Sequence, residues 1–297
     1  MNVTARKIQL PLKINSIQAL PNLAIDKTNE VRSSLSETCQ LLGIADVGKL
    51  SDDQFCRRRV AAGRWIFGGG EKFDSVFIVY AGFIKTMLLD EAGNEQILHF
   101  PMRGDLLGID GLHANYHSSQ AVALSDCELI VIPFTELVKL AHQHATIQAW
   151  LYSAISREIA REYAVVSLLG TLGAEARVAR FLVSLSSRFE ALGHSPTHFN
   201  LHMTRQEIGS YLGLTLETVS RALSALHEAQ FIDISQRCVV LKNIAGLCAL
   251  KKLSASTKLH SLKGRIKDTI NIAEAARTAV PKKNNSIWSP LVSTQTT

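Results

Sequence analysis

The stretch that most constrains the fold of this chain is Thr204–His227, which predicts two helices joined by a tight turn. Thr204 is placed to cap the first helix, because its hydroxyl can accept from the Glu207 amide while the Glu207 carboxylate reaches back to the capping amide. Gly213 stands where this helix must end, since glycine adopts a positive φ without steric cost. The spacing of apolar residues predicts the buried face of the helix at Ile208, Tyr211 and Leu212.

The second helix is predicted to begin after Thr215 and to turn an apolar stripe inward at Val219, Leu223 and Leu226. Its outer face carries polar side chains at Glu217, Thr218, Ser220 and Arg221. A recognition helix presents such positions to base edges in the major groove of DNA. Arg221 can donate two parallel hydrogen bonds to guanine, Glu217 can accept from cytosine, and Ser220 can contact several base edges or a phosphate. The alternative is that Glu217 and Arg221 form only a weak surface ion pair along the helix.

Two short strands are predicted after the second helix, over residues 231–243 with a turn at Ser235 and Gln236. With the two helices they make a winged helix-turn-helix. Arg237 in the wing is a candidate phosphate contact, although a solvated strand charge would give the same pattern. The candidate DNA-binding residues are Thr204, Arg205, Thr215, Glu217, Thr218, Ser220, Arg221 and Arg237.

The amino-terminal half has a different pattern, in which short apolar runs alternate with glycine and Asn/Asp turns from Gly63 to Phe134. Regular spacing of this kind indicates an all-β roll or barrel. Residues 135–169 contain no proline, and their apolar seam predicts one long helix that pairs with a second copy in a parallel dimer. The predicted dimer residues are Ile147, Leu151, Ile155, Ile159 and Glu162.

Glu162 is predicted to regulate how strongly the two copies of the dimer associate. It would meet its twin across a parallel seam, where like charges oppose association. The alternative is a solvated Glu162 that pairs with Arg157 or Arg161 of its own helix.

The order of these parts and several motifs resemble the CRP/FNR family of bacterial transcription regulators. The resemblance covers about residues 60–250 and rests on Leu214–Arg221 and on the turn residues Gly63, Gly82, Gly93, Gly104-Asp105 and Gly108. It implies an α+β fold with an N-terminal cyclic-nucleotide-binding-like β-roll, a long dimerisation helix and a C-terminal winged helix-turn-helix.

The Glu-Thr-Val-Ser-Arg pattern at 217–221 is similar to the FNR and FixK branch of that family. This similarity implies a TTGAT-like half-site, repeated as an inverted pair on double-stranded DNA. It also implies a homodimer and RNA polymerase as a partner. A twofold dimer would place its recognition helices about one helical turn of DNA apart on such a palindrome.

The β-roll departs from the family's ligand-binding patterns. Where members that bind cyclic nucleotides carry a Gly-Glu pair and an Arg-Ser pair, this chain has Ile109 in place of the Glu and Ser119-Gln120 in place of the Arg-Ser. A cyclic phosphate would then lack its bidentate partner, so neither cAMP nor cGMP is expected.

FNR-type members hold an iron–sulfur cluster on three closely spaced cysteines and one in the β domain. The cysteines of this chain are never closer than ten residues, so neither this cluster nor another metal site is expected; they are Cys39, Cys56, Cys127, Cys238 and Cys248.

Three modes of control remain open. A haem ligand could come from among His113, His117, His142 and His144, since the family has haem-binding members, although histidines in such loops are usually just solvated. Cys39 or Cys56 could act as a redox thiol, because Arg57–Arg59 would lower the pKa of an exposed Cys56. The resemblance to FixK implies a third mode, a regulator without a ligand that is controlled by its own abundance.

The positive charge of the chain lies mostly at its C-terminal end. Of the net charge of +6, residues 251–297 contribute +7, so residues 1–250 sum to −1. The DNA-binding domain is therefore nearly neutral, and charge-driven affinity must come from a local face or from this tail.

The predicted domains are an unassigned extension (1–45), the β-roll (46–134), the helix (135–169), the winged helix-turn-helix (170–250) and a basic tail with a composition typical of disorder (251–297).

No apolar run is long enough to span a membrane and no signal-peptide core is present, which predicts a cytoplasmic protein. The sequence also lacks a phosphate-cradling glycine loop, a metal-spaced His/Cys set and a nucleophile elbow, so we expect no enzyme. Two alternatives stay open: a general DNA-binding protein without sequence preference, and a protein-interaction module that does not need Arg221.

Overall fold

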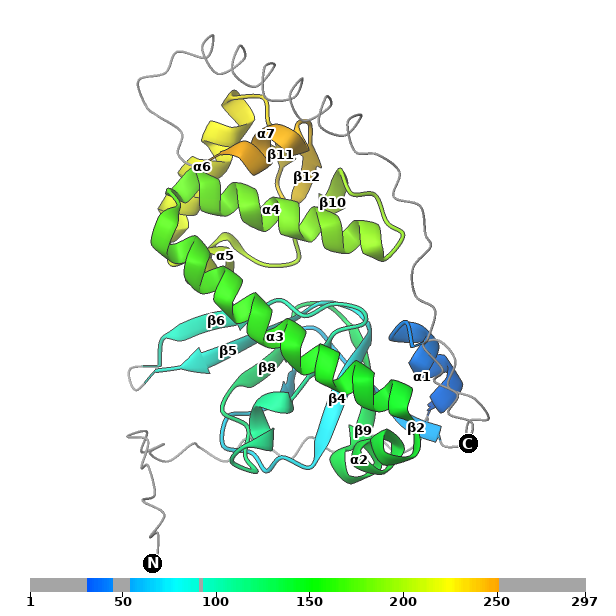
Figure 1. Ribbon diagram of the computed structural model, residues 1–297. Helices are drawn as coiled ribbons and strands as arrows, with labels where there is room; N and C mark the ends of the chain where they lie inside the picture. Colours follow the sequence, from blue (N-terminus) through cyan, green and yellow to red (C-terminus); the bar gives the residue numbers. More distant parts are fainter. Residues whose placement is uncertain (1–30, 45–53, 91–92, 251–297) are drawn as a thin grey trace, which may run out of the picture.

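Figure 1 shows the computed structural model of the chain, which describes residues 31–44, 54–90 and 93–250. A β-roll occupies one end of the molecule, and helix α3 (Ala145–Thr171) crosses the front of it diagonally. The C-terminal helices and strands lie at the other end of α3 (Figure 1). The predicted tail 251–297 and most of the predicted extension 1–45 lie outside the described residues.

Two antiparallel sheets form the β-roll, as the sequence predicted. Their strand orders are β1-β2-β9-β4-β7 and β3-β8-β5-β6. The first sheet contains β1 (Arg32–Ser34), β2 (Gln54–Val60), β9 (Cys127–Pro133), β4 (Ser75–Ala81) and β7 (Leu106–Leu107). The second contains β3 (Trp65–Phe67), β8 (Gln120–Ala123), β5 (Ile84–Leu89) and β6 (Glu95–His99). A 3-10 helix, Ile109–Leu112, follows β7.

Strand β4 joins two parts of the roll's core because it is apolar on both faces. Successive strand residues point to opposite sides of a sheet. Val76 and Ile78 therefore pack in a cluster with helices α1 (Leu35–Leu41) and α2 (Phe134–Gln143). Phe77 and Val79 pack in another cluster with residues of the second sheet, including Ile84. A continuous apolar run is the pattern expected of a strand buried on both faces.

Part of the unassigned extension belongs to the roll. Strand β1 pairs antiparallel with β2, where Ser33 lies opposite Phe55. Helix α1 begins after Ser34, whose side chain accepts from the Glu37 amide. Leu35 and Cys39 of this helix are buried in the same cluster as Ile78. Residues 31–44 thus cover one edge of the β-roll.

The single helix predicted over 135–169 is two helices, α2 and α3, and this prediction was wrong. The chain breaks at His144, whose φ of −128° and ψ of 107° are extended. The break allows Leu137 and Leu140 of α2 to pack with Ile147 and Trp150 of α3 in one core cluster. One straight helix would run past the roll and would not bring both sets onto it. Because neither glycine nor proline marks the break, tertiary packing must fix it.

The C-terminal half is a winged helix-turn-helix with additional elements. The predicted wing strands are β11 (Ile232–Ser235) and β12 (Cys238–Leu241), and Gln236 in their turn has a φ of 53°. A third strand, β10 (His198–Asn200), pairs with β12. The helices are α4 (Ala174–Ala191), α5 (Arg205–Leu212), α6 (Leu216–Glu228) and α7 (Ile244–Ala249).

The two halves share a hydrophobic core. Phe100, which follows β6, has its ring centroid 5.9 Å from that of Phe181 on α4 and 5.4 Å from that of Tyr211 on α5. Phe83 stacks on His202 with 3.7 Å between the ring centroids. The C-terminal half therefore packs directly on the β5–β6 side of the roll. Within the described residues, no helix combines the length and apolar character needed to cross a membrane.

Candidate nucleic-acid interface

The cap of α5 has the geometry predicted from the sequence. The Thr204 hydroxyl accepts from the Glu207 amide at 3.2 Å, and the Glu207 carboxylate accepts from the Thr204 amide at 2.7 Å. Burial alone would raise the pKa of Glu207, but the Thr204 amide and the Lys85 ammonium lower it below the usual value. The carboxylate that completes the cap is therefore charged at neutral pH.

Two glycines let α5 and α6 meet at the tight turn. Gly213 ends α5 with a φ of 62°, in the left-handed region that favours glycine. Gly209 needs a different property, since a Cβ there would lie 2.6 Å from the Leu214 carbonyl oxygen. A side chain at 209 would force the two helices apart. Gly213 was predicted from the sequence, whereas Gly209 was not.

Helix α6 presents the predicted outer face. The Thr215 hydroxyl caps it by accepting from the Thr218 amide at 3.2 Å. Val219, Leu223 and Leu226 are buried, as predicted. Glu217 and Arg221 are exposed, and Thr218 and Ser220 are half-buried beside them. Leu216, which the sequence analysis did not include among the candidates, is a further exposed residue of this face.

The Glu217 carboxylate interacts more strongly with the start of its own helix than with Arg221. Its pKa is lowered, first by a hydrogen bond from its own backbone amide and then by the Thr215 hydroxyl, whereas the attraction of Arg221 is the weakest cause. A carboxylate in the first turn also interacts favourably with the helix dipole. The structure therefore gives little support to a tight Glu217–Arg221 pair as the only role of these residues.

The remaining candidates surround α6. Arg237 is exposed beside the wing turn, and Arg205 is half-buried in the first turn of α5. The wing holds a local ion pair, in which the Lys242 ammonium lies 2.8 Å from the Asp233 carboxylate. This half-exposed pair leaves Arg237 as the charged residue at the tip of the wing.

Helix α5 is anchored to the β-roll. The Ser210 hydroxyl donates to the Glu95 carbonyl at 2.7 Å and accepts from the Ile97 amide at 2.9 Å. The Lys85 ammonium lies 3.0 Å from the Glu207 carboxylate and 2.8 Å from that of Glu95. The capping carboxylate of the helix-turn-helix is therefore also an ion-pair partner of the roll. The contacts that cross from α5 to the roll were not predicted, because Ser210 and Glu207 lie more than a hundred positions from Glu95, Ile97 and Lys85.

Arg177 on α4 ties together the ends of two helices. Its guanidinium donates to the carbonyls of Leu169 and Leu172, at 2.6 and 2.9 Å, where α3 ends. It also donates to the Leu212 carbonyl of α5 at 3.1 Å. Carbonyls at a helix C-terminus have no partner within the helix, and a cation satisfies them well. Arg177 thus fixes how the helix-turn-helix follows α3.

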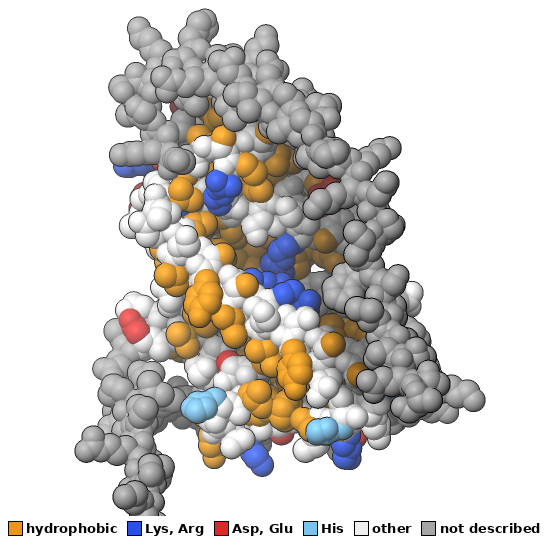
Figure 2. Space-filling view, in the orientation of Figure 1, with side chains coloured by type: hydrophobic (Ala, Val, Ile, Leu, Met, Phe, Trp, Pro, Cys, Tyr) orange, Lys and Arg blue, Asp and Glu red, His pale blue; other side chains and the backbone are white. Residues whose placement is uncertain are grey.

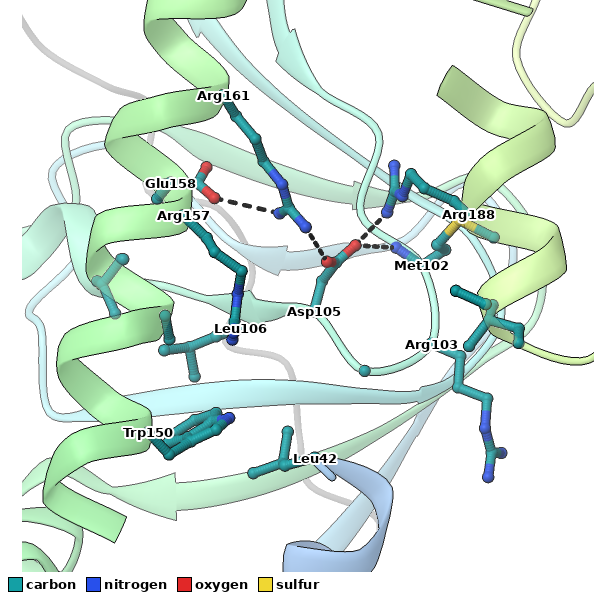
Figure 3. Close-up of a pocket in the computed structure, with 15 residues that line it drawn as sticks. Leu42, Met102, Arg103, Asp105, Leu106, Trp150, Arg157, Glu158, Arg161 and Arg188 are labelled. Atoms are coloured by element: carbon teal, nitrogen blue, oxygen red, sulfur yellow. Dashed lines mark hydrogen bonds and ion pairs between the residues drawn. The ribbon is translucent and has the colours of Figure 1, made fainter. Parts of the chain in front are cut away.

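A buried carboxylate joins the roll to α3 and α4 (Figure 3). Asp105 accepts from Arg161 of α3 at 2.8 Å, from Arg188 of α4 and from the Met102 amide at 2.9 Å. Burial alone would raise the pKa of Asp105, but the two guanidiniums outweigh burial and lower it. This carboxylate therefore stays charged and links the two halves.

The exposed stripe on α3 differs from the predicted seam. Ile147 is only 3 % exposed and packs among Leu137, Leu140 and Trp150, so it belongs to the roll's core and its assignment to a dimer surface was wrong. Leu151 packs against the same core, and Ile155 is half-buried. The large exposed apolar residues of α3 are Tyr152, Ile159, Tyr163 and Val166, and Figure 2 shows orange side chains along this helix. Glu162 is exposed at the side of this stripe.

Inside the roll, Asp110 binds the loop that follows it. Its carboxylate accepts from the amides of Ser118 and Ser119 at 2.9 and 2.8 Å and from both their hydroxyls. Its other oxygen lies 3.2 Å from Nδ1 of His117. Burial opposes ionisation, but these hydrogen bonds lower the pKa of Asp110 to about 2. The Asp110 carboxylate, an anion of the protein itself, thus accepts the hydrogen bonds that the amides and hydroxyls of Ser118 and Ser119 can donate.

The candidate haem and thiol residues lie in different environments. His117 is buried, and its ring stacks on Phe67 with 4.0 Å between centroids, whereas His113 and His142 are exposed and His144 is half-buried at the helix break. Cys39 is buried in the core, and burial raises the pKa of its thiol. Cys56 is half-buried, and the neighbouring Arg57 and Arg59 pair with Glu128.

Two protein-family models match the chain. The cyclic nucleotide-binding domain matches residues 57–144, and the Crp-like helix-turn-helix domain matches residues 176–250. They fall on the β-roll with α2 and on the C-terminal half, in the predicted order.

Characterised regulators match most of the chain. The transcriptional regulatory protein btr of Bordetella pertussis is 40 % identical over 215 residues, which cover 72 % of this chain and 89 % of that protein. The fumarate and nitrate reduction regulatory protein of Vibrio cholerae is 34 % identical over 208 residues, which cover 69 % and 83 %. Among solved structures, FixK2 from Bradyrhizobium japonicum matches with a TM-score of 0.60 and 31 % identity, over 67 % of this chain and 98 % of that chain.

Proposed function

Because this chain belongs to the CRP/FNR family of transcription regulators, we propose that it binds an inverted repeat of TTGAT-like half-sites as a homodimer, through helix α6. The observation that carries the proposal is the exposed face of α6, where Arg221 and Glu217 lie side by side with Ser220. These side chains can pair with guanine, cytosine and a phosphate or base edge respectively. The proposed role is non-catalytic, with RNA polymerase as the partner on the promoter.

The other polar residues of the site would position α6 on the duplex. Thr204, Arg205, Thr215, Thr218 and Arg237 lie at the starts of α5 and α6 and in the wing. Helix N-termini and basic side chains bind phosphates without reading sequence. Removal of Arg237 should therefore weaken binding to all sequences alike, whereas removal of Arg221 should relax sequence preference.

The homodimer is supported by the exposed stripe of α3. Tyr152, Ile159, Tyr163 and Val166 are each about half or more exposed, with fractions from 49 to 71 %. Their separations of seven, four and three residues match the spacing that lets two parallel helices pack as a coiled coil. A dimer on this stripe would use Ile159 of the predicted seam at its centre and Ile155 and Glu162 at its side.

We further propose that the roll works without cAMP, cGMP or an iron–sulfur cluster. In support, the Asp110 carboxylate already takes the amides and hydroxyls of Ser118 and Ser119, where an incoming anion would have to compete with a fixed charge. The burial of Cys39 also argues against a freely reactive thiol there. His117 remains a candidate haem ligand only if its contacts with Asp110 and Phe67 are broken.

Footprinting on a duplex that carries an inverted TTGAT-like repeat tests the proposal. We expect the wild type to protect the repeat and Arg221→Ala to bind it roughly tenfold to a hundredfold more weakly, the effect of losing a bidentate base contact. Arg221 is exposed, so the free energy of unfolding should change by no more than about 0.5 kcal/mol. Wild-type binding without preference for the repeat would identify a general DNA-binding protein instead.

A further inference from the structure

A cavity of about 270 Å³ lies between the β-roll, α3 and α4 (Figure 3), and no residue of α6 lines it. One side of it is apolar and is lined by Leu42, Leu106, Ile109, Trp150 and Ala154. The other side carries the guanidiniums of Arg157, Arg161 and Arg188. Cavities that bind small molecules combine an apolar lining with a few convergent polar groups in this way.

The positive charge around the cavity is not fully neutralised by the residues around it. Arg161 and Arg188 share the Asp105 carboxylate, and Arg161 also lies 3.3 Å from Glu158. Glu158 is itself engaged by His99, at 2.6 Å. Arg103 also lines the cavity, but it donates to the Tyr80 carbonyl and lies over the Tyr80 ring. Arg157 is left, and in Figure 3 no hydrogen bond or ion pair joins it to the other residues drawn.

Arg157 is an exposed residue of α3 whose charge repels that of Arg161, and a bound anion would relieve this repulsion. Arg157 and Arg161 stand four positions apart on α3, where like charges destabilise a helix. Arg161 has two carboxylates to compensate for this repulsion. The side chain of Arg157 extends along α3 toward Leu106 and Trp150, into the cavity (Figure 3). A guanidinium beside an apolar wall is suited to an anion that has an apolar body.

We propose that this cavity binds a small organic carboxylate. Arg157 pairs with the carboxylate through two parallel hydrogen bonds, and Trp150, Leu106 and Ile109 contact the apolar body. Among the cavity guanidiniums of the residues that the structure describes, Arg157 is the one with neither a carboxylate partner nor the Tyr80 contacts of Arg103, and one such group matches a single negative charge. Arg157 lies on the side of α3 opposite Ile159, so a dimer on the exposed stripe leaves the cavity open.

Residues of both halves line the cavity, because Arg188 comes from α4 and Asp105 from the roll. Binding of the carboxylate there does not depend on which DNA sequence α6 reads. A binding measurement without DNA therefore tests the cavity separately from the proposed function.

Calorimetric titration of the full chain with benzoate tests the proposal. We expect saturable binding to the wild type and an affinity at least about tenfold lower for Arg157→Gln, the effect of losing a charge-assisted pair. Arg64→Gln, which removes an exposed arginine outside the cavity, should bind benzoate like the wild type. Thermal unfolding of each variant checks that the exposed substitutions leave the fold intact.

Two further probes test the two sides of the cavity. Acetate keeps the carboxylate without the ring, and benzamide keeps the ring without the charge, so both should bind the wild type more weakly than benzoate. Equal affinities of wild type and Arg157→Gln for benzoate would overturn the proposal. Binding of acetate as tight as that of benzoate would also overturn it, because it would indicate only general attraction of anions to arginine.

Discussion

The two halves of the chain place their polar groups in opposite ways. In the C-terminal half, Glu217 and Arg221 lie exposed on α6 above a core of apolar side chains. In the β-roll, Asp105 and Asp110 are largely buried, and each holds several donors. Exposed groups can meet a partner and add little to stability, whereas a buried charge is costly unless it is paired. Substitutions in the two halves should therefore change different measured quantities.

The largest expected effect on stability is that of Asp105→Ala. The substitution leaves the guanidiniums of Arg161 and Arg188 without their shared carboxylate. Because these side chains are 38 % and 27 % exposed, we expect a loss of about 2–4 kcal/mol, toward the lower end of the cost of breaking a buried pair. Denaturant unfolding without DNA measures this loss. The pKa of Asp105 is lowered in the folded chain, so its contribution is present above the ordinary Asp pKa and is lost as the pH falls through the lowered value.

Asp233→Ala is the matched control in the C-terminal half. Asp233 also pairs with a cation, Lys242 at 2.8 Å, but its side chain is 45 % exposed. Exposed pairs contribute about 0–1 kcal/mol, so this variant should unfold almost like the wild type. If Asp105→Ala and Asp233→Ala lost the same stability, the contrast between the two halves would be wrong.

The same contrast explains which features could be predicted from the sequence. The cap at Thr204, the turn at Gly213 and the inward stripe of α6 depend on residues within a few positions of each other, and these predictions were confirmed. The wing strands and the roll's alternation of short strands and turns are local patterns of the same kind.

The buried contacts could not be predicted because they join distant residues. Asp105 and Arg188 are 83 positions apart, and Ile97 and Ser210 are 113 apart. No local pattern pairs such residues. The break at His144 belongs to the same class, since it is fixed by how α2 and α3 pack on the roll, and the misplacement of Ile147 follows from missing it.

Asp110→Asn should have an intermediate effect that depends on pH. A pKa of about 2 against an ordinary value of 3.8 corresponds to about 2 kcal/mol of stability at neutral pH. This contribution is present above the ordinary value and disappears as the pH falls toward the folded value. The difference in unfolding free energy between wild type and Asp110→Asn should therefore be constant above about pH 5 and shrink between about pH 4 and 2. A difference that does not change with pH would contradict the role of the charged carboxylate.

The smallest expected effect is that of Glu162→Ala on the association of two copies of the chain through α3, the helix between the two halves. Glu162 is exposed at the side of the α3 stripe, so in the proposed dimer its charge would lie near the charge of its twin and weaken association. Since exposed charge pairs are worth about 0.2–1 kcal/mol, Glu162→Ala should tighten the dimer by roughly a factor of two to five in sedimentation. High salt should reduce the difference by screening the repulsion. Glu190→Ala removes an equal charge from an exposed position on α4 and should leave association unchanged. Unchanged association of Glu162→Ala at low salt would remove Glu162 from the dimer surface and leave the apolar stripe alone to hold the two copies together.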